Sequence, residues 1–153
     1  MRYFNVYGRR QDPNGAYAAA IPKFTLALMA HESPLIHGDG TSSRDFTYID
    51  NVIQMNYLAA TTTNPDAINQ VFNTAVGERT DLNQLTSLLK KYLSVFDPEV
   101  ENVPITYGPV SKGDIPHSLA SIEKAEKMLG YKPEFNFEEG LKLAVEWYWN
   151  NLK

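Results

Sequence analysis

The sequence predicts an α/β fold, and three observations support this prediction. Short runs of apolar and β-branched residues alternate with longer segments whose apolar residues recur at helical spacing. Clusters of glycine, proline and asparagine separate these segments, as turns do. Hydrophobic residues make up 43% and charged residues 21% of the 153 residues, which is ordinary for one globular domain. The predicted strands are too scattered along the chain to form a self-contained parallel sheet.

The first predicted strand covers residues 3–7, which favour β structure and are almost without charge. This composition is typical of a strand inside a sheet, where both edges need hydrogen-bonding neighbours. Residues 9–15 form a predicted loop that ends in Pro-Asn-Gly. Residues 16–31 predict a helix, and Pro22 should lie in its first turn because proline has no N–H to donate.

The middle of the chain predicts three more strands and one helix. Residues 35–40 predict a short strand that enters a tight turn, and residues 44–50 predict a strand that ends at a helix N-cap, Asp50. The face of that helix is expected to carry Val52, Ile53, Met55, Asn56, Ala59 and Ala60. Residues 70–76 predict a further strand, which Gly77 ends.

The second half of the chain is predicted to be mainly helical. Thr80 or Asp81 should cap a helix with an apolar side. That side carries Leu82, Leu85, Leu88 and Leu89. Residues 103–107 predict a strand. Ser121 is expected to cap a short helix that ends at Gly130.

The last predicted helix begins with a capping-box pattern, Asn136 and Glu139. One side of this helix carries Leu141, Ala144, Val145, Tyr148 and Leu152. Trp147 and Trp149 flank Tyr148, and we expect these aromatic side chains to pack in the core and at its rim rather than to form a stacking platform.

Composition excludes several functions. The chain has no cysteine, which excludes disulfides, thiolate metal sites and a cysteine nucleophile. The formal net charge is −4 with the two signs interspersed, so a nucleic-acid partner is not expected. No apolar run reaches the roughly 20 residues of a membrane span, and we expect a cytoplasmic protein. The three histidines stand far apart, and we expect no metal site.

Three polar features are candidates for ligand binding, each with a structural alternative. Arg44 offers a rigid fork suited to phosphate or carboxylate, but it could instead pair with Asp39 or Asp45. Asn5 lies within an apolar strand, where it either braces a neighbouring loop or faces a ligand. Residues 111–118 form a polar loop that either binds a ligand or is a solvated turn. Its polar side chains are Lys112, Asp114 and Ser118.

Four stretches carry a resemblance to a known family. They are RYFNVYGRRQDPNGAYAAAIPKF, GDGTSSRDFTYIDNVIQMNY, FNTAVGERTDLNQL and KGDIPHSLASIEKAEKMLGYKP. In this order they resemble the C-terminal part of extended short-chain dehydrogenase/reductases that act on nucleotide sugars. The subgroup is similar to bacterial NAD-dependent UDP-N-acetylhexosamine 4-epimerases, which interconvert UDP-N-acetylglucosamine and UDP-N-acetylgalactosamine. The resemblance runs from Arg2 to about Trp149.

The resemblance implies a division of labour within the whole enzyme. An N-terminal Rossmann domain would hold NAD and carry a catalytic Tyr-x-x-x-Lys pair, and neither that pair nor a G-x-G-x-x-G motif occurs in this chain. Residues 1–153 would form the C-terminal, substrate-binding region, with orphaned strands of the nucleotide-binding sheet. We therefore expect no catalytic residue here, no tight NAD binding and no activity by this chain alone. Exposed strands favour self-association, and the missing Rossmann half is the other expected partner.

The resemblance also implies contacts with a UDP-sugar at eight residues, and a position beside the nicotinamide for Tyr3. The eight are Arg44 at the diphosphate, Asn5 at the diphosphate or the sugar, Gln11 and Ser118 at the sugar, Ala19 along the nucleotide, Phe24 and the Leu35 backbone at the uracil, and Asp114 at the ribose. A phosphate-binding arginine of the family is replaced here by Ser111, and Lys112 stands beside it.

Two alternatives to this interpretation stay open. The chain could belong to another enzyme of the superfamily, such as a dehydratase or a decarboxylating relative that acts on a different nucleotide sugar. It could also be a non-catalytic module that binds a nucleotide sugar or complements a separately encoded Rossmann half.

Overall fold

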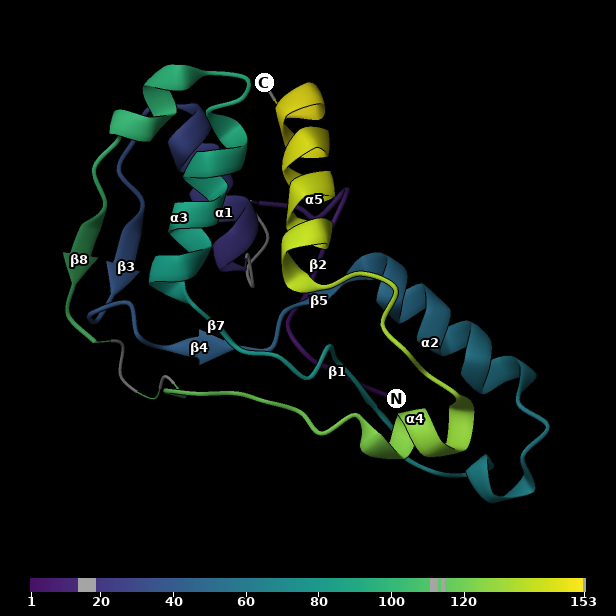
Figure 1. Cartoon of the computed structure of the whole chain (residues 1–153). Helices are drawn as coiled ribbons and strands as arrows, with labels where there is room; N and C mark the ends of the chain where they lie inside the picture. The colour runs from purple at the N-terminus through teal and green to yellow at the C-terminus, as the bar shows by residue number, and fades with distance from the viewer. Residues whose placement is uncertain (14–18, 111–112, 114, 153) are drawn as a thin grey trace.

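The computed structural model describes residues 1–13, 19–110, 113 and 115–152, and within these residues it contains eight short strands and five α-helices (Figure 1). The strands are β1 (Arg2–Tyr3), β2 (Val6–Tyr7), β3 (Leu35–His37), β4 (Ser43–Arg44), β5 (Thr47–Tyr48), β6 (Asn73–Thr74), β7 (Thr80–Asp81) and β8 (Thr106–Gly108). The helices are α1 (Ala20–Met29), α2 (Ile49–Thr61), α3 (Leu82–Leu93), α4 (Glu123–Leu129) and α5 (Phe137–Asn151), with the 3₁₀ helices η1 (Pro65–Ala67) and η2 (Pro98–Asn102).

The strands form four separate pairs. Three pairs are parallel, β1 with β6, β2 with β5 and β3 with β8, and β4 pairs antiparallel with β7. All three parallel pairs join segments far apart in the sequence, as crossover connections require. The predicted α/β class is therefore confirmed, and so is the expectation of scattered strands.

The predicted strand at residues 3–7 is divided in two, and its first part is not buried. Asn5 separates β1 from β2 with a φ of 37°, in the left-handed region that asparagine tolerates better than most residues. Tyr3 is 52% exposed, so the prediction of a buried strand is wrong for β1. Within the described residues β1 pairs on one edge only, with β6.

Local capping chemistry explains where several helices begin. Pro22 lies in the first turn of α1, as predicted. Asp81 caps α3 by accepting a hydrogen bond from the backbone N–H of Gln84 at 2.7 Å. The capping box of Asn136 and Glu139 at the start of α5 is also confirmed.

Two predicted caps are wrong. The N-cap of α2 is Tyr48, because Asp50 lies inside the first turn and its carboxylate pairs with Arg9 at 2.8 Å. The N-cap of α4 is Ile122, because Ser121 lies one residue further out, where its carbonyl accepts a hydrogen bond from Asn73.

The chain packs into two regions. In the three-helix region, α1, α3 and α5 stand together in the upper part of Figure 1 and enclose the larger hydrophobic cluster. Its buried members include Tyr7, Leu28, Leu89, Val145 and Tyr148. Gly140 lets α5 approach the strands closely, since a Cβ there would lie 2.5 Å from the Tyr7 hydroxyl.

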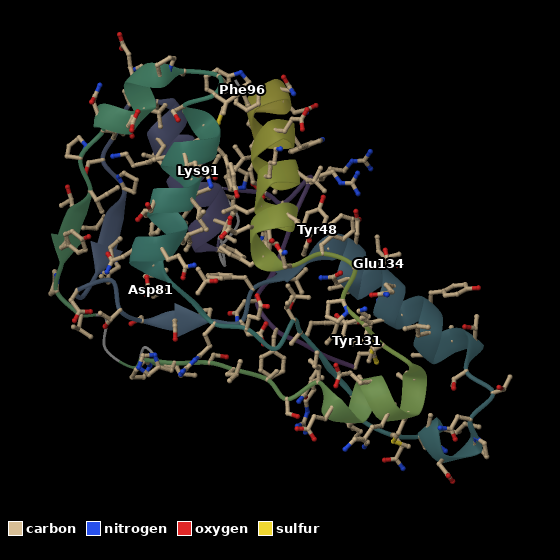
Figure 2. All side chains as sticks on the ribbon, in the orientation of Figure 1. Tyr48, Asp81, Lys91, Phe96, Tyr131 and Glu134 are labelled. Carbon is tan, nitrogen blue, oxygen red and sulfur yellow. The ribbon has the colours of Figure 1, made fainter. Side chains whose placement is uncertain are left out.

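The second region, the α2–α4 region, comprises β1, β6, α2, η1 and α4 and encloses the smaller hydrophobic cluster. Its buried members are Met55, Ala67, Phe72, Ala125, Leu129 and Tyr131. Tyr131, labelled in Figure 2, follows α4 and donates a hydrogen bond to the carbonyl of Ala75 at 2.8 Å. Among the described residues, no helix has the length and apolar character that a membrane span requires.

The predicted apolar face of α2 is only half correct. Val52 and Met55 are buried as expected, but Ile53 is 59% exposed, and Asn56 is exposed as well. Helical spacing alone allowed two overlapping apolar stripes, and among the described residues only the stripe of Val52 and Met55 is buried.

Candidate functional site

A pocket of about 270 Å³ brings together three of the predicted binding residues, Asn5, Ala19 and Arg44. The remaining lining residues are Val6, Tyr7, Ala20, Ile21, Ser42, Phe46 and Leu82. They come from β2, the start of α1, the turn before β4, the link between β4 and β5, and the first residue of α3. The pocket therefore lies where the strands meet the three-helix region.

The start of α1 gives this pocket a positive end. Ala19 is the N-cap and its side chain has no oxygen that could accept the first backbone N–H groups. Ala20 and Ile21, the first two helical residues, both line the pocket. The unsatisfied N–H groups at a helix N-terminus and the helix dipole together favour an anion at such a position.

Arg44 supplies a second positive group at the same pocket. It lies on β4, where it pairs with Thr80, and its side chain is half-buried. Its Nη1 donates hydrogen bonds to the carbonyls of Ser43 at 2.9 Å and Pro116 at 3.4 Å. The first contact is with the preceding residue, and the second is with a residue 72 positions later in the chain. Together they hold the guanidinium in place at the pocket wall.

Asn5 both braces a neighbouring strand and lines the pocket. Its Nδ2 donates to the carbonyl of Asp45 at 3.0 Å, and its own carbonyl accepts from the N–H of Thr47 at 3.3 Å. The structural alternative for Asn5, that it braces a loop, is therefore confirmed. Its place on the pocket wall leaves a ligand contact as a prediction.

The backbone beside Arg44 is fixed by Asp45, a residue that the sequence did not single out for this role. Its fully buried carboxylate accepts hydrogen bonds from the N–H groups of Val76 and Gly77, each at 3.0 Å, and of Ala120 at 3.3 Å. Burial raises the pKa of Asp45 above its ordinary value, and the three N–H donors oppose that rise. Asp45 thus links β4 to the loop after β6 and to the segment before α4.

A second and larger hollow, of about 700 Å³, adjoins the pocket through Ser42, which lines both. The other residues around it are His37, Gly38, Asp39, Tyr107, Gly108, Pro109 and Val110. Tyr107 is 53% exposed, so part of an aromatic ring is available there. Neither Ser42 nor Tyr107 was predicted. The turn residues around Ser42 were a signal for the former, whereas nothing in the sequence marked the latter.

Two further predicted residues serve the packing of the three-helix region. Gln11 donates to the carbonyl of Val6 at 3.3 Å and lies 3.5 Å from the hydroxyl of Tyr148. Phe24 is half-buried and packs against the larger hydrophobic cluster. Neither residue lines the pocket or the adjoining hollow.

The other predicted residues in the described part of the chain do not line the pocket. The N–H of Ser118 donates to the carbonyl of Ser43 at 3.0 Å, which places Ser118 next to the strand of Arg44. Leu35 is 46% exposed on β3, two residues before His37. Tyr3 is exposed on β1.

The hydroxyl of Tyr3 donates to Asn56 of α2 at 2.9 Å. Asp114, with its neighbours Ser111 and Lys112, lies outside the described residues. In the part of the chain that the structure describes, no three histidines or carboxylates cluster as metal ligands would.

Fold and pocket together define an α/β protein whose pocket, beside short parallel strands, is lined by Arg44 and by the first residues of α1. The family model described as GDP-mannose 4,6 dehydratase matches residues 1–144, and the chain belongs to this family. The predicted membership among nucleotide-sugar dehydrogenase/reductases is thereby confirmed.

Solved structures of UDP-sugar epimerases resemble the chain closely. UDP-glucose 4-epimerase of Thermotoga maritima, solved with UDP-glucose, is 39% identical with a TM-score of 0.86, over 99% of this chain and 46% of that one. UDP-N-acetylglucosamine 4-epimerase of Methanobrevibacter ruminantium, solved with UDP-N-acetylmuramic acid, is also 39% identical, with a TM-score of 0.85, over 97% of this chain and 45% of that one.

A third solved structure contains the cofactor. UDP-glucuronic acid 4-epimerase of Bacillus cereus, solved with UDP-glucuronic acid and NAD, is 28% identical with a TM-score of 0.80, over 97% of this chain and 44% of that one. The chain spans less than half the length of the curated relatives that it matches first.

Proposed function

We propose that this chain is the UDP-sugar-binding part of an NAD-dependent nucleotide-sugar 4-epimerase of the UDP-N-acetylglucosamine type, and that turnover requires a Rossmann half. The observation that carries this proposal is the pocket where Arg44 and the start of α1 converge. Two independent positive groups at one pocket suit a diphosphate, which carries charge on several oxygens.

The diphosphate lies between Arg44 and the N–H groups of Ala20 and Ile21 in this proposal. Arginine offers paired donors that match phosphate oxygens, and its Nη1 is already held by two carbonyls. A ligand would therefore meet a guanidinium that loses little freedom on binding. Asn5, which directly precedes β2, adds an amide group to the same pocket.

The nucleoside extends from the pocket past Ser42 into the adjoining hollow. Ser42 lines both spaces, so a ligand with a diphosphate at one end and a base at the other can occupy them together. The exposed ring of Tyr107 offers a surface on which a base can stack. The sugar end then points away from the hollow, toward Asn5 between β1 and β2.

The rest of the enzyme would dock against β1, β6 and α2. β1 pairs on one edge within the described residues, and the exposed side of α2 carries Ile53 and Tyr57. NAD, when bound in the whole enzyme, supplies reversible hydride exchange at C4 of the sugar. The residues of this chain bind and orient the nucleotide sugar, and Tyr3 stands on β1 at the edge where a neighbouring strand would add.

The choice of the N-acetylglucosamine type rests on sequence similarity. A solved UDP-N-acetylglucosamine 4-epimerase is 39% identical to this chain, the same identity as a UDP-glucose 4-epimerase. The discriminating comparison is therefore between UDP-N-acetylglucosamine and UDP-glucose, with GDP-mannose as a test of the base.

Isothermal titration calorimetry with UDP tests the proposal. We expect UDP to bind the chain and Arg44→Ala to weaken this binding at least about tenfold, because a charge-assisted hydrogen bond contributes roughly 1.5–3 kcal/mol. Arg2→Ala is the matched control, since Arg2 is exposed on β1 and lines neither space. Equal affinity for UDP and GDP would contradict a uracil-selective hollow.

A further inference from the structure

The side chain of Asn83 joins two walls of the hollow proposed to hold the nucleoside. Asn83 lies in the first turn of α3, outside the lining of both spaces. Its Nδ2 donates to the carbonyl of Asp39 at 3.0 Å, and its Oδ1 accepts from the hydroxyl of Tyr107 at 2.8 Å. One amide group therefore connects the turn after β3 with the aromatic residue of β8.

The turn is shaped to receive this amide. Gly40 has a φ of 81°, and a Cβ at Gly40 would lie 2.2 Å from Oδ1 of Asn83, so only glycine leaves room. The carbonyl of Gly40 also accepts hydrogen bonds from the N–H groups of Leu82 at 3.0 Å and Asn83 at 3.3 Å. Backbone and side chain thus hold the same turn against the start of α3.

The same turn is also stiffened from within. Oδ1 of Asp39 accepts from the N–H of Thr41 at 3.0 Å and from its hydroxyl at 2.7 Å. The turn leads directly to Ser42, the residue shared by the hollow and the pocket of Arg44. A change in the position of this turn would therefore alter the nucleoside end and the junction with the diphosphate pocket.

We propose that Asn83 is a positioning residue for nucleotide binding: it orients the ring of Tyr107 and fixes the turn at residues 38–42 so that the hollow accepts a base. This inference rests on the proposed function, because it assigns the hollow to the nucleoside. Asn83 touches Tyr107 and Asp39 and lines neither the hollow nor the pocket.

A double-mutant cycle tests this role with two ligands, UDP and inorganic pyrophosphate. We expect Asn83→Ala and Tyr107→Phe each to weaken UDP binding about three- to tenfold. The double variant should bind UDP about as well as the single variant with the lower affinity, because both changes remove the same hydrogen bond. Pyrophosphate has no base, so its affinity, measured by NMR titration, should stay within about twofold in all three variants. Loss of general structure would weaken both ligands together.

Asn64→Ala is the matched control. The Asn64 amide also makes two hydrogen bonds, from the N–H of Asp66 and to the carbonyl of Met128, but it lies after α2 in the other region. It should lower the melting temperature without changing UDP affinity. Tyr107→Phe removes one exposed hydroxyl and keeps the test valid if Asn83→Ala does not fold.

Three outcomes would overturn the inference: unchanged UDP affinity in Tyr107→Phe, additive losses in the double variant, or an equal loss of pyrophosphate binding. These outcomes are distinguishable from failure of the proposed function. If the unchanged chain binds UDP and Arg44→Ala does not, but Tyr107→Phe binds it normally, only the role of Asn83 is wrong. If the unchanged chain fails to bind UDP, the proposed function itself is wrong.

Discussion

The two regions of this chain differ in how completely they bury their apolar side chains. In the three-helix region, Leu89, Val145 and Tyr148 are fully buried between α1, α3 and α5. In the α2–α4 region, Ile53 and Tyr57 are 59% and 67% exposed along one side of α2. Single exposed apolar residues are normal, but Ile53 and Tyr57 lie about one helical turn apart, near a strand, β1, that pairs on one edge only within the described residues.

The difference shows which part of the fold stabilises itself. The three-helix region carries local devices, the Asp81 cap and the capping box of α5, together with a continuous core. The α2–α4 region has a smaller core of its own, and the buried carboxylate of Asp45 joins it to its neighbour through three backbone N–H groups. The pocket of Arg44 lies beside this link, at the three-helix region.

A pair of tyrosine variants tests this contrast with the largest expected effect. Tyr148→Ala should lower the free energy of unfolding by about 3–5 kcal/mol, because it empties a fully buried site and removes a hydrogen bond of 2.8 Å to the carbonyl of Gly8. Tyr57→Ala, the matched control, should change it by no more than about 0.5 kcal/mol. Urea denaturation measures both, and comparable losses would erase the distinction between the regions.

Removal of the Asp45 carboxylate should have the next largest effect on the free energy of unfolding. Asp45→Ala leaves three buried N–H donors without their acceptor, which costs about 3 kcal/mol in total at 1 kcal/mol or more for each. Hydrogen exchange should show faster opening at Val76 and Gly77 than in α5. Asp50→Ala breaks a surface ion pair with Arg9 and should cost no more than about 1 kcal/mol. A uniform increase in exchange throughout the chain would argue against a local link.

A substitution on the exposed face of β1 and α2 should have the smallest effect on stability and should change self-association. The β1–α2 face, defined by Tyr3, Ile53 and Tyr57, is exposed, and the bond from Tyr3 to Asn56 makes it continuous. Ile53→Glu should lower the mass that sedimentation measures at high protein concentration, while leaving stability nearly unchanged. Val95→Glu serves as the control, because Val95 is 78% exposed in the three-helix region. If Val95→Glu lowers the mass and Ile53→Glu does not, the contact between copies of the chain lies in the three-helix region instead.

Features set by neighbouring residues could be predicted from the sequence. Pro22, the Asp81 cap and the capping box all depend on residues within one turn of each other. The sequence singled out Arg44 because a guanidinium after a polar turn suits an anion, and the structure places it at a pocket, while its contact with an anion stays a prediction. The break of the first strand at Asn5 could not be predicted, since asparagine tolerates a φ of 37° but its β-favouring neighbours predict an extended residue there.

Roles that depend on distant partners were missed. The N–H donors to the Asp45 carboxylate lie 31 to 75 residues away, so no spacing rule reveals them. The bond between Asn83 and Tyr107 spans 24 residues and two different elements. Gln11 and Phe24 make packing contacts that the sequence did not reveal, and their contacts with a ligand stay predictions.

The central claim is that the pocket of Arg44 and α1 binds the diphosphate of a UDP-sugar without the rest of the enzyme. Calorimetric titration of the 153-residue chain with UDP, alongside Arg44→Ala and Arg2→Ala, tests it most directly. The account predicts binding that is preserved in Arg2→Ala and weakened at least about tenfold in Arg44→Ala. Equal affinity in the unchanged chain and Arg44→Ala would contradict it.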